Sequence, residues 1–291
     1  MRPVRSMIFT PGDRLDMVEK AVRSGTDAVI IDLEDAVSND NKATARSNLA
    51  QLPSSPVPYY VRTNGATTPW FWEDVAAVGY ADVVGLILPK AESPTVVSQV
   101  DGALTVAELR SGKQIGDLTL IPLIESALGV RLTYEIALAS NRVECVMFGG
   151  GEQGDLVADL GAEWSPEGTG LMQARSQVVL SARAAGVPYP MEAVFMDFRN
   201  NDALRVESEI ARTLGYVGKV AIHPGQVPVI NEVFTPSPEV VEYQRKVLAA
   251  FEEAEVAGKA SIAVDGRMVD YAVARVARTI IARAEAAGES G

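Results

Sequence analysis

Ala28-Val29-Ile30-Ile31-Asp32-Leu33-Glu34-Asp35 is the stretch from which the fold of this chain can be worked out. An apolar, mostly β-branched run leads directly into three carboxylates within four positions, a pattern typical of a buried strand whose end opens onto a polar space. Carboxylates this close repel one another unless a cation, an arginine or a proton is shared among them. The stretch therefore predicts a cationic partner elsewhere in the chain. The alternative is that these acids are simply solvated at the end of a strand. Each recurrence of the same pattern later in the sequence makes this alternative less favoured.

Eight short apolar runs in the chain have the composition of strands. They lie at residues 6–9, 28–33, 59–62, 83–88, 119–124, 143–148, 187–194 and 219–222. Between them, helical periodicity is found at residues 16–22, 94–110, 130–139, 168–185 and 203–215. Strands that alternate with helices form parallel βαβ units, and eight units match a closed barrel better than an open sheet. The predicted fold class is therefore α/β, a (β/α)8 TIM barrel, and the lack of a Gly-x-Gly-x-x-Gly turn after the first strand weakens a dinucleotide-binding fold.

Composition narrows the class of protein. The 291 residues suit one α/β barrel or two smaller domains. The formal net charge of −12 argues against a surface for nucleic acid or an anionic membrane, so an anionic ligand must meet a local group of Arg and Lys. The single histidine, His223, argues against histidine-rich zinc sites and Ser-His hydrolase chemistry, and the single cysteine, Cys145, is expected to be a core thiol. Because no apolar run reaches roughly 18 residues and the start lacks a long apolar segment, we expect a soluble, cytoplasmic protein.

Polar residues follow seven of the predicted strands at the point where each strand ends. They are Pro11-Gly12-Asp13-Arg14, Glu34-Asp35, Arg62-Thr63-Asn64, Pro89-Lys90-Ala91-Glu92, Glu125-Ser126, Gly149-Gly150-Gly151-Glu152-Gln153-Gly154-Asp155 and His223-Pro224. In a barrel all of these lie on the C-terminal face, where the active sites of this fold are built. No single motif among them is diagnostic, but their coincidence indicates an active site.

The pattern changes beyond Phe234. A capped helix is expected from Pro238 to about residue 257, then a hairpin over 261–269 and a second helix over 271–287, for which Asp270 is a natural N-cap. We therefore expect a catalytic barrel over residues 1–234 and a helix–hairpin–helix extension over 235–291. Such an arm either packs on a neighbouring subunit or covers the bottom of its own barrel.

Seven phrases of the sequence carry a resemblance to a known family. They are Ser6-Met7-Ile8-Phe9-Thr10-Pro11-Gly12, Asp32-Leu33-Glu34-Asp35-Ala36-Val37, Val61-Arg62-Thr63-Asn64, Leu88-Pro89-Lys90-Ala91-Glu92, Ile124-Glu125-Ser126, Asp155-Leu156-Val157-Ala158-Asp159-Leu160-Gly161 and Ala221-Ile222-His223-Pro224-Gly225-Gln226. In this order they resemble the citrate lyase β-subunit family, within the larger HpcH/HpaI aldolase and malyl-CoA lyase superfamily. The resemblance extends over nearly the whole chain.

The resemblance implies a (β/α)8 barrel, assembled as a homotrimer or hexamer, that uses Mg²⁺, with Mn²⁺ as a substitute. Such enzymes make or break a carbon–carbon bond in a 3-hydroxyacyl thioester such as malyl-CoA, citramalyl-CoA or citryl-CoA, giving an acyl-CoA and a 2-oxo acid. A malate-synthase-like enzyme that also hydrolyses the thioester is one alternative. A subunit that acts on an acyl-carrier protein within a citrate lyase complex is another, and a scaffold derived from an enzyme is a third.

By this resemblance, Glu125 and Asp155 match the metal ligands, and two carboxylates suit Mg²⁺ because it keeps several waters. The glycine-rich turn before Asp155 is longer than in the usual family pattern, which leaves Glu152 as a competing ligand. Arg62 matches an arginine that contacts the substrate, although it could equally neutralise the acids of the second strand. Glu34 and Asp35 would then orient metal-bound water and Arg62, and Asp32 is expected to be structural.

The remaining roles are also implied by the resemblance. Asp270 matches an aspartate that reaches the active site of a neighbouring subunit as the base, and its role as an N-cap is compatible with this. Arg14 and Lys20 match residues that meet coenzyme A, with solvated surface charge as the alternative for Lys20. The turn Pro11-Gly12 would let backbone N–H groups approach a phosphate or carbonyl. Lys90 could pair with Glu92 or with the acid cluster, and His223 could line the acyl pocket or be a satisfied histidine at a strand end. Structural roles are favoured for both.

Overall fold

The computed structural model describes residues 3–165 and 167–288, which form two compact units. The first unit is Pro3–Glu232 and the second begins at Val233. The predicted boundary, after residue 234, lies two residues further along the chain.

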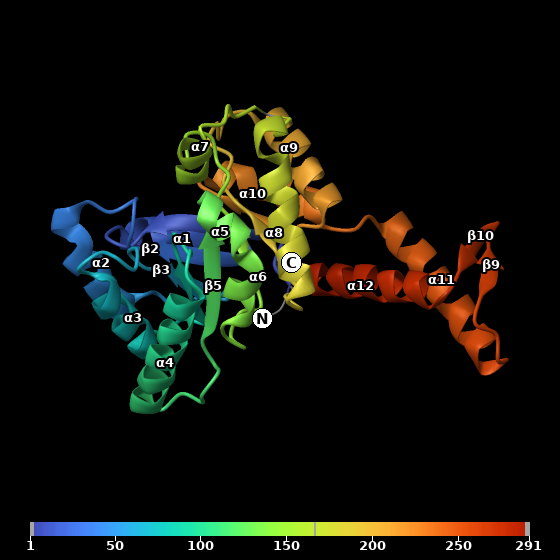
Figure 1. The fold of residues 1–291 in the computed structure, drawn as a ribbon, viewed down its shortest axis with the longest axis horizontal. Coiled ribbons are helices and arrows are strands. Elements are labelled where there is room, and N and C mark those ends of the chain that lie inside the picture. Colours follow the sequence, from blue (N-terminus) through green and yellow to red (C-terminus); the bar gives the residue numbers. More distant parts are fainter. Residues whose placement is uncertain (1–2, 166, 289–291) are drawn as a thin grey trace. The chain divides into compact units, whose positions relative to one another are not determined.

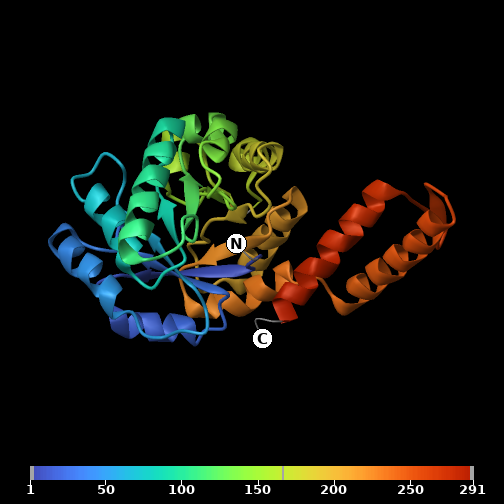
Figure 2. The same ribbon diagram turned by 90° about the horizontal axis from the view of Figure 1, so that it is seen from below.

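The first unit is a closed barrel of eight parallel strands in sequence order, surrounded by helices (Figures 1 and 2). The strands are β1 Ser6–Pro11, β2 Ala28–Asp32, β3 Tyr59–Arg62, β4 Gly85–Leu88, β5 Thr119–Ile124, β6 Met147–Phe148, β7 Met191–Glu192 and β8 Gly218–Ala221. The barrel closes where β1 pairs with β8, through Ser6–Ile8 and Lys219–Ala221. The predicted (β/α)8 barrel is confirmed.

Helices and short 3₁₀ turns connect the strands. The α-helices of this unit are α1 Leu15–Val22, α2 Lys42–Asn48, α3 Phe71–Tyr80, α4 Pro94–Ser111, α5 Ala127–Arg131, α6 Thr133–Leu138, α7 Asp155–Leu160, α8 Met172–Ala184, α9 Asn201–Leu214 and α10 Val227–Phe234. The 3₁₀ turns are Asn39–Asn41, Leu49–Gln51, Thr169–Leu171 and Pro224–Gln226. Helix α10 extends two residues past Glu232, where the first unit ends.

One predicted helix, over residues 130–139, is instead two short helices that meet at Leu132. The hydroxyl of Thr133 donates to the carbonyls of Gly129, at 2.9 Å, and Val130, at 3.1 Å. A hydroxyl bonded in this way competes with the backbone N–H groups that would continue α5. Helix α5 also begins earlier than predicted, because the Ser126 hydroxyl accepts the N–H of Gly129 at 3.1 Å.

Strands β6 and β7 are shorter than the apolar runs at 143–148 and 187–194 predicted. Val143, Cys145 and Val146 are all buried, so the apolar run at 143–148 correctly predicted burial. Only Met147 and Phe148, however, are in register with β7 as a ladder. An apolar run predicts that a segment is buried. A β-strand also requires backbone hydrogen bonds to a neighbouring strand, which the run does not predict.

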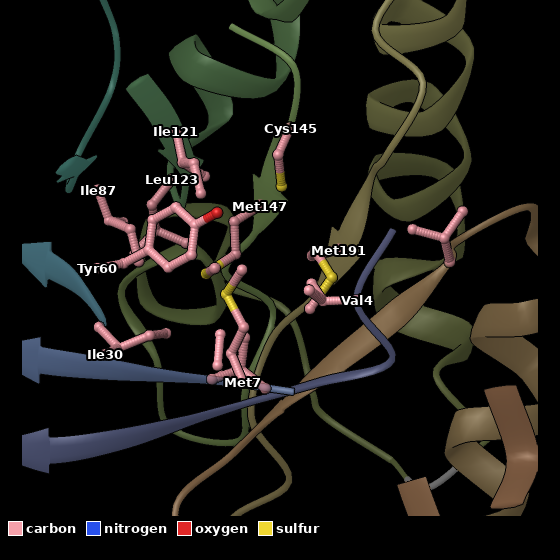
Figure 3. Packing of buried hydrophobic residues seen from close by; sticks show 13 residues of the cluster. Val4, Met7, Ile30, Tyr60, Ile87, Ile121, Leu123, Cys145, Met147 and Met191 are labelled. Carbon is pink, nitrogen blue, oxygen red and sulfur yellow. The ribbon is translucent and has the colours of Figure 1, made fainter. Parts of the chain in front are cut away.

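The inside of the barrel is filled by apolar side chains from many of its strands. The cluster is Val4, Met7, Ala28, Ile30, Tyr60, Ile87, Ile121, Leu123, Cys145, Met147, Met191, Val217 and Val220. Figure 3 shows side chains from different strands directed toward a common centre. Cys145 is a free, fully buried thiol, as expected, and burial raises its pKa well above the usual range. The barrel is therefore a packed core, and the chemistry must take place at its rim.

The second unit contains two helices and a hairpin. Helix α11 is Pro238–Val256, strands β9 Ile262–Val264 and β10 Arg267–Val269 pair antiparallel, and helix α12 is Tyr271–Gly288. Its own small core comprises Val247, Phe251, Val264, Val269, Ala274 and Ala277. Among the described residues of both units, no helix combines the length and the hydropathy needed to cross a bilayer.

Candidate active site

Asp32 and Arg62 anchor the site at the ends of β2 and β3. They stand opposite each other in the parallel ladder, and the Arg62 fork donates to both carboxylate oxygens, Nε to Oδ1 at 2.7 Å and Nη2 to Oδ2 at 2.6 Å. Asp32 is fully buried and also accepts the N–H groups of Glu34 and Ala36, each at 3.0 Å. Arg62 is therefore the cationic partner that the acidic stretch requires, and Asp32 is structural.

The third nitrogen of Arg62 faces the other two acids of the stretch. Nη1 lies 3.2 Å from Oε2 of Glu34 and 3.9 Å from Oδ2 of Asp35. The guanidinium also lies over the ring of Phe9, 4.4 Å from its centroid. Burial alone would lower the pKa of Arg62, but the carboxylates of Asp32, Glu34 and Glu125 outweigh it and raise the pKa. The arginine is permanently charged and its orientation is fixed.

Glu125 follows β5 and is held from two sides. Its Oε1 accepts the backbone N–H of Lys90 at 2.8 Å. On the other side, the N–H of Gly149 donates to the Ile124 carbonyl at 2.7 Å, and a Cβ at position 149 would lie only 2.6 Å from the Cβ of Glu125. Burial, together with the nearby carboxylates of Glu34 and Asp155, raises the pKa of Glu125 to about 7. A carboxylate in such surroundings is stabilised by a cation.

The ammonium of Lys90 joins two of the acids. It lies 3.3 Å from Oε1 of Glu34 and 3.2 Å from Oδ2 of Asp155. The sequence left open whether Lys90 pairs with Glu92 or with the acid cluster, and the structure shows the cluster. Its backbone has φ = 50°, in the left-handed region that residues other than glycine seldom adopt.

Asp155 is the first residue of α7 and is half-exposed. The glycine-rich segment turns back just before it, with the N–H of Gly154 donating to the Gly151 carbonyl at 3.0 Å and Gln153 at φ = 58°. Asp155 and Glu152 lie on the same cavity, so the choice between them as a ligand stays open to experiment.

A cavity of about 220 Å³ brings together four of the predicted site residues, Asp35, Arg62, Glu125 and Asp155. Glu34, Asp270, Arg14, Lys20, Pro11 and Gly12 do not line it. Its polar lining includes Asp35, Arg62, Glu125, Glu152 and Asp155, and its apolar lining includes Phe9, Leu123, Met147, Val194 and Met196. Among the described residues, no group of three or more His, Cys, Asp and Glu side chains has the arrangement of a metal site. Two carboxylates that leave the other positions to water and substrate oxygens suit Mg²⁺ and do not suit structural zinc.

Lys42 supports the site without lining it, and the sequence analysis missed it. Its buried ammonium donates to the carbonyls of Leu33, at 2.8 Å, and Glu34, at 2.6 Å. Asn64 is fixed in a similar way, because Asp74 Oδ2 accepts both its backbone and its side-chain N–H groups, at 2.9 and 2.6 Å. In the sequence, Lys42 lies in a polar segment and is indistinguishable from a surface charge.

Neither residue of the Pro11-Gly12 turn has a free N–H group, and contact of this turn with coenzyme A stays a prediction. The N–H of Gly12 donates to the Asp32 carbonyl at 2.8 Å, and proline has no N–H, so neither residue can offer a backbone donor to a phosphate. Gly12 is needed for packing, because a Cβ there would lie 2.9 Å from the Asp32 carbonyl oxygen. Arg14 makes a two-point contact with Asp16, both distances 2.9 Å, and Lys20 is exposed on α1.

Asp270 and His223 have clear local roles. Oδ1 of Asp270 accepts the N–H groups of Ala272 and Val273, each at 3.0 Å, which caps α12 as the sequence indicated. Nδ1 of His223 accepts the N–H of Gly225 at 3.0 Å, and the ring stacks on Phe198 with centroids 5.0 Å apart. The structural role favoured for His223 agrees with these contacts, whereas the role of Asp270 in a neighbouring active site stays a prediction.

Residues 5–224 match the family described as HpcH/HpaI aldolase/citrate lyase. The chain belongs to this family. It is 36% identical to a (3S)-malyl-CoA thioesterase of Cereibacter sphaeroides, over 99% of this chain and 97% of that protein. It is 34% identical to the citrate lyase subunit beta of Escherichia coli, over 99% and 95%. Among solved structures it resembles CitE from Mycobacterium tuberculosis in complex with magnesium, acetoacetate and coenzyme A, with 31% identity, a TM-score of 0.76 and coverage of 97% of this chain and 98% of that one. The family resemblance that the motifs carried is confirmed.

Proposed function

We propose that the protein is a Mg²⁺-dependent carbon–carbon lyase that cleaves or forms a 3-hydroxyacyl-CoA thioester. The observation that carries the proposal is the placement of Glu125 and Asp155, after neighbouring strands β5 and β6, on one cavity with Arg62. Relatives that act on malyl-CoA, and a CitE structure that contains magnesium and coenzyme A, support the same chemistry.

In the proposed reaction, Glu125 and Asp155 hold the metal. Bound Mg²⁺ would polarise the carbonyl of the 2-oxo acid and hold its carboxylate. A base removes the hydroxyl proton of the substrate, the carbonyl of the oxo acid forms, and the electrons of the broken carbon–carbon bond pass to the thioester as an enolate. Arg62, which is permanently charged and fixed by Asp32, is suited to stabilise that developing negative charge.

The base and the carrier site complete the proposal. Asp270 of a neighbouring subunit is proposed as the base, and Glu34 and Asp35 orient Arg62 and metal-bound water. Arg14 and Lys20 meet the phosphates of coenzyme A, because a chain of net charge −12 must supply local cations for an anionic ligand. The proposed assembly is a homotrimer or hexamer, which light scattering on the purified protein would test. The proposed location is the cytoplasm.

Hydrolysis of the thioester is a second candidate function, favoured by the 36% identity to a (3S)-malyl-CoA thioesterase. A lyase releases a 2-oxo acid and leaves the thioester intact, whereas a thioesterase releases free coenzyme A thiol. The two products are therefore measured in the same reaction.

The test uses purified protein, Mg²⁺ and a panel of malyl-, citramalyl- and citryl-CoA. We expect 2-oxo acid, trapped as its phenylhydrazone, from at least one of them, and none when EDTA is added or with Asp155→Asn. Thiol without oxo acid would favour the thioesterase. Activity only with acylated carrier protein would favour a citrate lyase subunit, and no product from any of these substrates would contradict the proposal.

A further inference from the structure

Among the residues that the structure describes, Lys90 is the cationic side chain that forms an ion pair with a proposed metal ligand, Asp155. Its ammonium lies 3.2 Å from Oδ2 of Asp155 and 3.3 Å from Oε1 of Glu34, and 45% of the side chain is exposed. Arg62, by contrast, is nearly buried and donates to Asp32 through Nε and Nη2. The ammonium of Lys90 is the more exposed of the two cations and is held by fewer bonds.

The backbone of Lys90 is fixed independently of its ammonium. Its N–H donates to Oε1 of Glu125 at 2.8 Å, and its backbone has a left-handed φ of 50°. The next residue, Ala91, donates its N–H to the Leu123 carbonyl at 3.1 Å, which ties the turn to β5. One residue thus contacts both proposed ligands, with its backbone on Glu125 and its side chain on Asp155.

An ammonium and a divalent cation attract the same carboxylate oxygen and repel each other. Where a positive side chain already neutralises Asp155, a metal must overcome both that ion pair and the repulsion between like charges. The effect is largest at short separation, and the ammonium lies within direct contact of Oδ2.

We propose that Lys90 is an internal counter-ion that competes with Mg²⁺ for Asp155, while its backbone N–H positions Glu125. Lys90 is therefore a positioning residue that sets the metal affinity of the site. This inference rests on the proposed function, because it takes Glu125 and Asp155 as the metal ligands.

The experiment measures cation binding in the absence of substrate, with Mn²⁺ followed by the electron paramagnetic resonance of the free ion and Mg²⁺ by calorimetry. Lys90→Met removes the charge and keeps most of the stem, and Lys90→Asn removes the charge while tolerating the left-handed backbone. Lys246→Met is the matched control, because it breaks a lysine–aspartate contact of 2.7 Å with Asp265 in the second unit. Circular dichroism confirms that each variant is folded.

We expect Lys90→Met and Lys90→Asn to bind Mn²⁺ about tenfold more tightly than the wild type, a change of about 1.4 kcal/mol, and Lys246→Met to be unchanged. In EDTA, the melting temperature of both Lys90 variants should fall, because the carboxylates lose their counter-ion. Unchanged or weaker binding in both variants would overturn the inference and leave the proposed function intact. Absence of Mn²⁺ binding in the wild type would instead overturn the metal-dependent function, and this inference with it.

Discussion

Asp32, Glu34 and Asp35 lie within four positions of the sequence but differ in their surroundings. Asp32 is fully buried and bonded by Arg62, Glu34 contacts both Arg62 and Lys90, and Asp35 is largely exposed on the cavity. The acidic stretch could be taken for the metal site itself, yet its first member has no oxygen left for a metal. Of the carboxylates that line the cavity, Glu125 and Asp155 are the ones proposed as ligands, and Glu152 is the competing one.

The division between ligand and supporting carboxylate gives the first prediction. Asp155→Asn should remove Mg²⁺ binding, because Asp155 is a proposed ligand. Asp35→Asn should weaken Mg²⁺ binding by about 10- to 100-fold, because Asp35 is proposed only to orient water and Arg62. Glu152→Gln is the control for the other acid of the turn. Calorimetry with Mg²⁺ measures all three, and equal losses in the Asp35 and Asp155 variants would contradict this division of roles.

Which residues gather at the site could be predicted because each follows a strand. Glu34, Arg62, Glu125 and Asp155 are brought to one rim by the parallel barrel, which the alternation of strands and helices already indicated. For Lys90 the sequence offered two partners, Glu92 and the acid cluster, without deciding between them, and for Lys42 it offered none. The backbone N–H of Lys90 donates to a carboxylate 35 positions away, and the side chain of Lys42 donates to backbone carbonyls at the end of β2. Neither contact produces a periodic pattern in the sequence.

At the scale of elements, the close approach of α3 and α4 depends on Gly79. A Cβ at position 79 would lie 2.2 Å from the Cβ of Ala107, whereas a Cβ at Gly102, in α4, would meet nothing within 4 Å. Gly79→Ala should therefore destabilise the protein by about 1–3 kcal/mol through overpacking. Gly102→Ala, its matched control, should stabilise it by about 0.5–1 kcal/mol because glycine is unfavourable within a helix. Urea unfolding measures both, and the same sign of change in the two variants would show that this contact is not the cause.

The order of elements was predictable and their lengths were less so. All eight strands are present where apolar runs predicted them, but β6 and β7 are each two residues long. The division of the predicted helix at 130–139 depends on where one threonine hydroxyl donates, which its residue type alone does not determine. Burial can thus be predicted from the apolar pattern of the sequence, whereas the residues at which helices and strands end depend on individual hydrogen bonds.

For the molecule as a whole, a buried ion pair away from the active site makes stability depend on pH. Arg142 donates to both oxygens of the fully buried Glu108, at 2.6 and 2.7 Å. Burial would raise the pKa of Glu108, but bonds from Arg142 and from the N–H groups of Leu118 and Gly116 outweigh it and lower the pKa. A lowered folded-state pKa means that the stabilisation is present above the unfolded-state pKa and is lost as the pH falls through the folded-state value.

Glu108→Gln should accordingly lower the free energy of unfolding at pH 7 by about 3–5 kcal/mol, because Arg142 keeps its buried charge without its strongest partner. The difference from the wild type should shrink as the pH falls below the usual carboxylate range. Urea unfolding at pH 7 and under acidic conditions measures this, and a difference that stays constant with pH would show that ionisation of Glu108 is not responsible.

The proposed role of Asp270 in a neighbouring subunit can be tested by combining two variant chains. Asp270→Asn keeps an N-cap for α12, so the melting temperature should stay within a degree or two while lyase activity falls. If the aspartate serves a neighbouring subunit, co-expression of Asp270→Asn with Asp155→Asn chains should restore activity that neither variant has alone, since mixed oligomers contain some intact sites. Mixed oligomers without activity would place the base elsewhere.

The pairing of β1 with β8 closes the barrel through residues about 210 positions apart. During synthesis at roughly 5–20 residues per second, β1 leaves the ribosome about 10–40 s before β8 exists. Throughout that time its outer edge presents N–H and C=O groups without their final partner, a form open to pairing with other chains. The unpaired edge of β1 is therefore exposed in the nascent chain and not in the finished barrel, so the nascent chain is the form in which a chaperone could prevent wrong pairing.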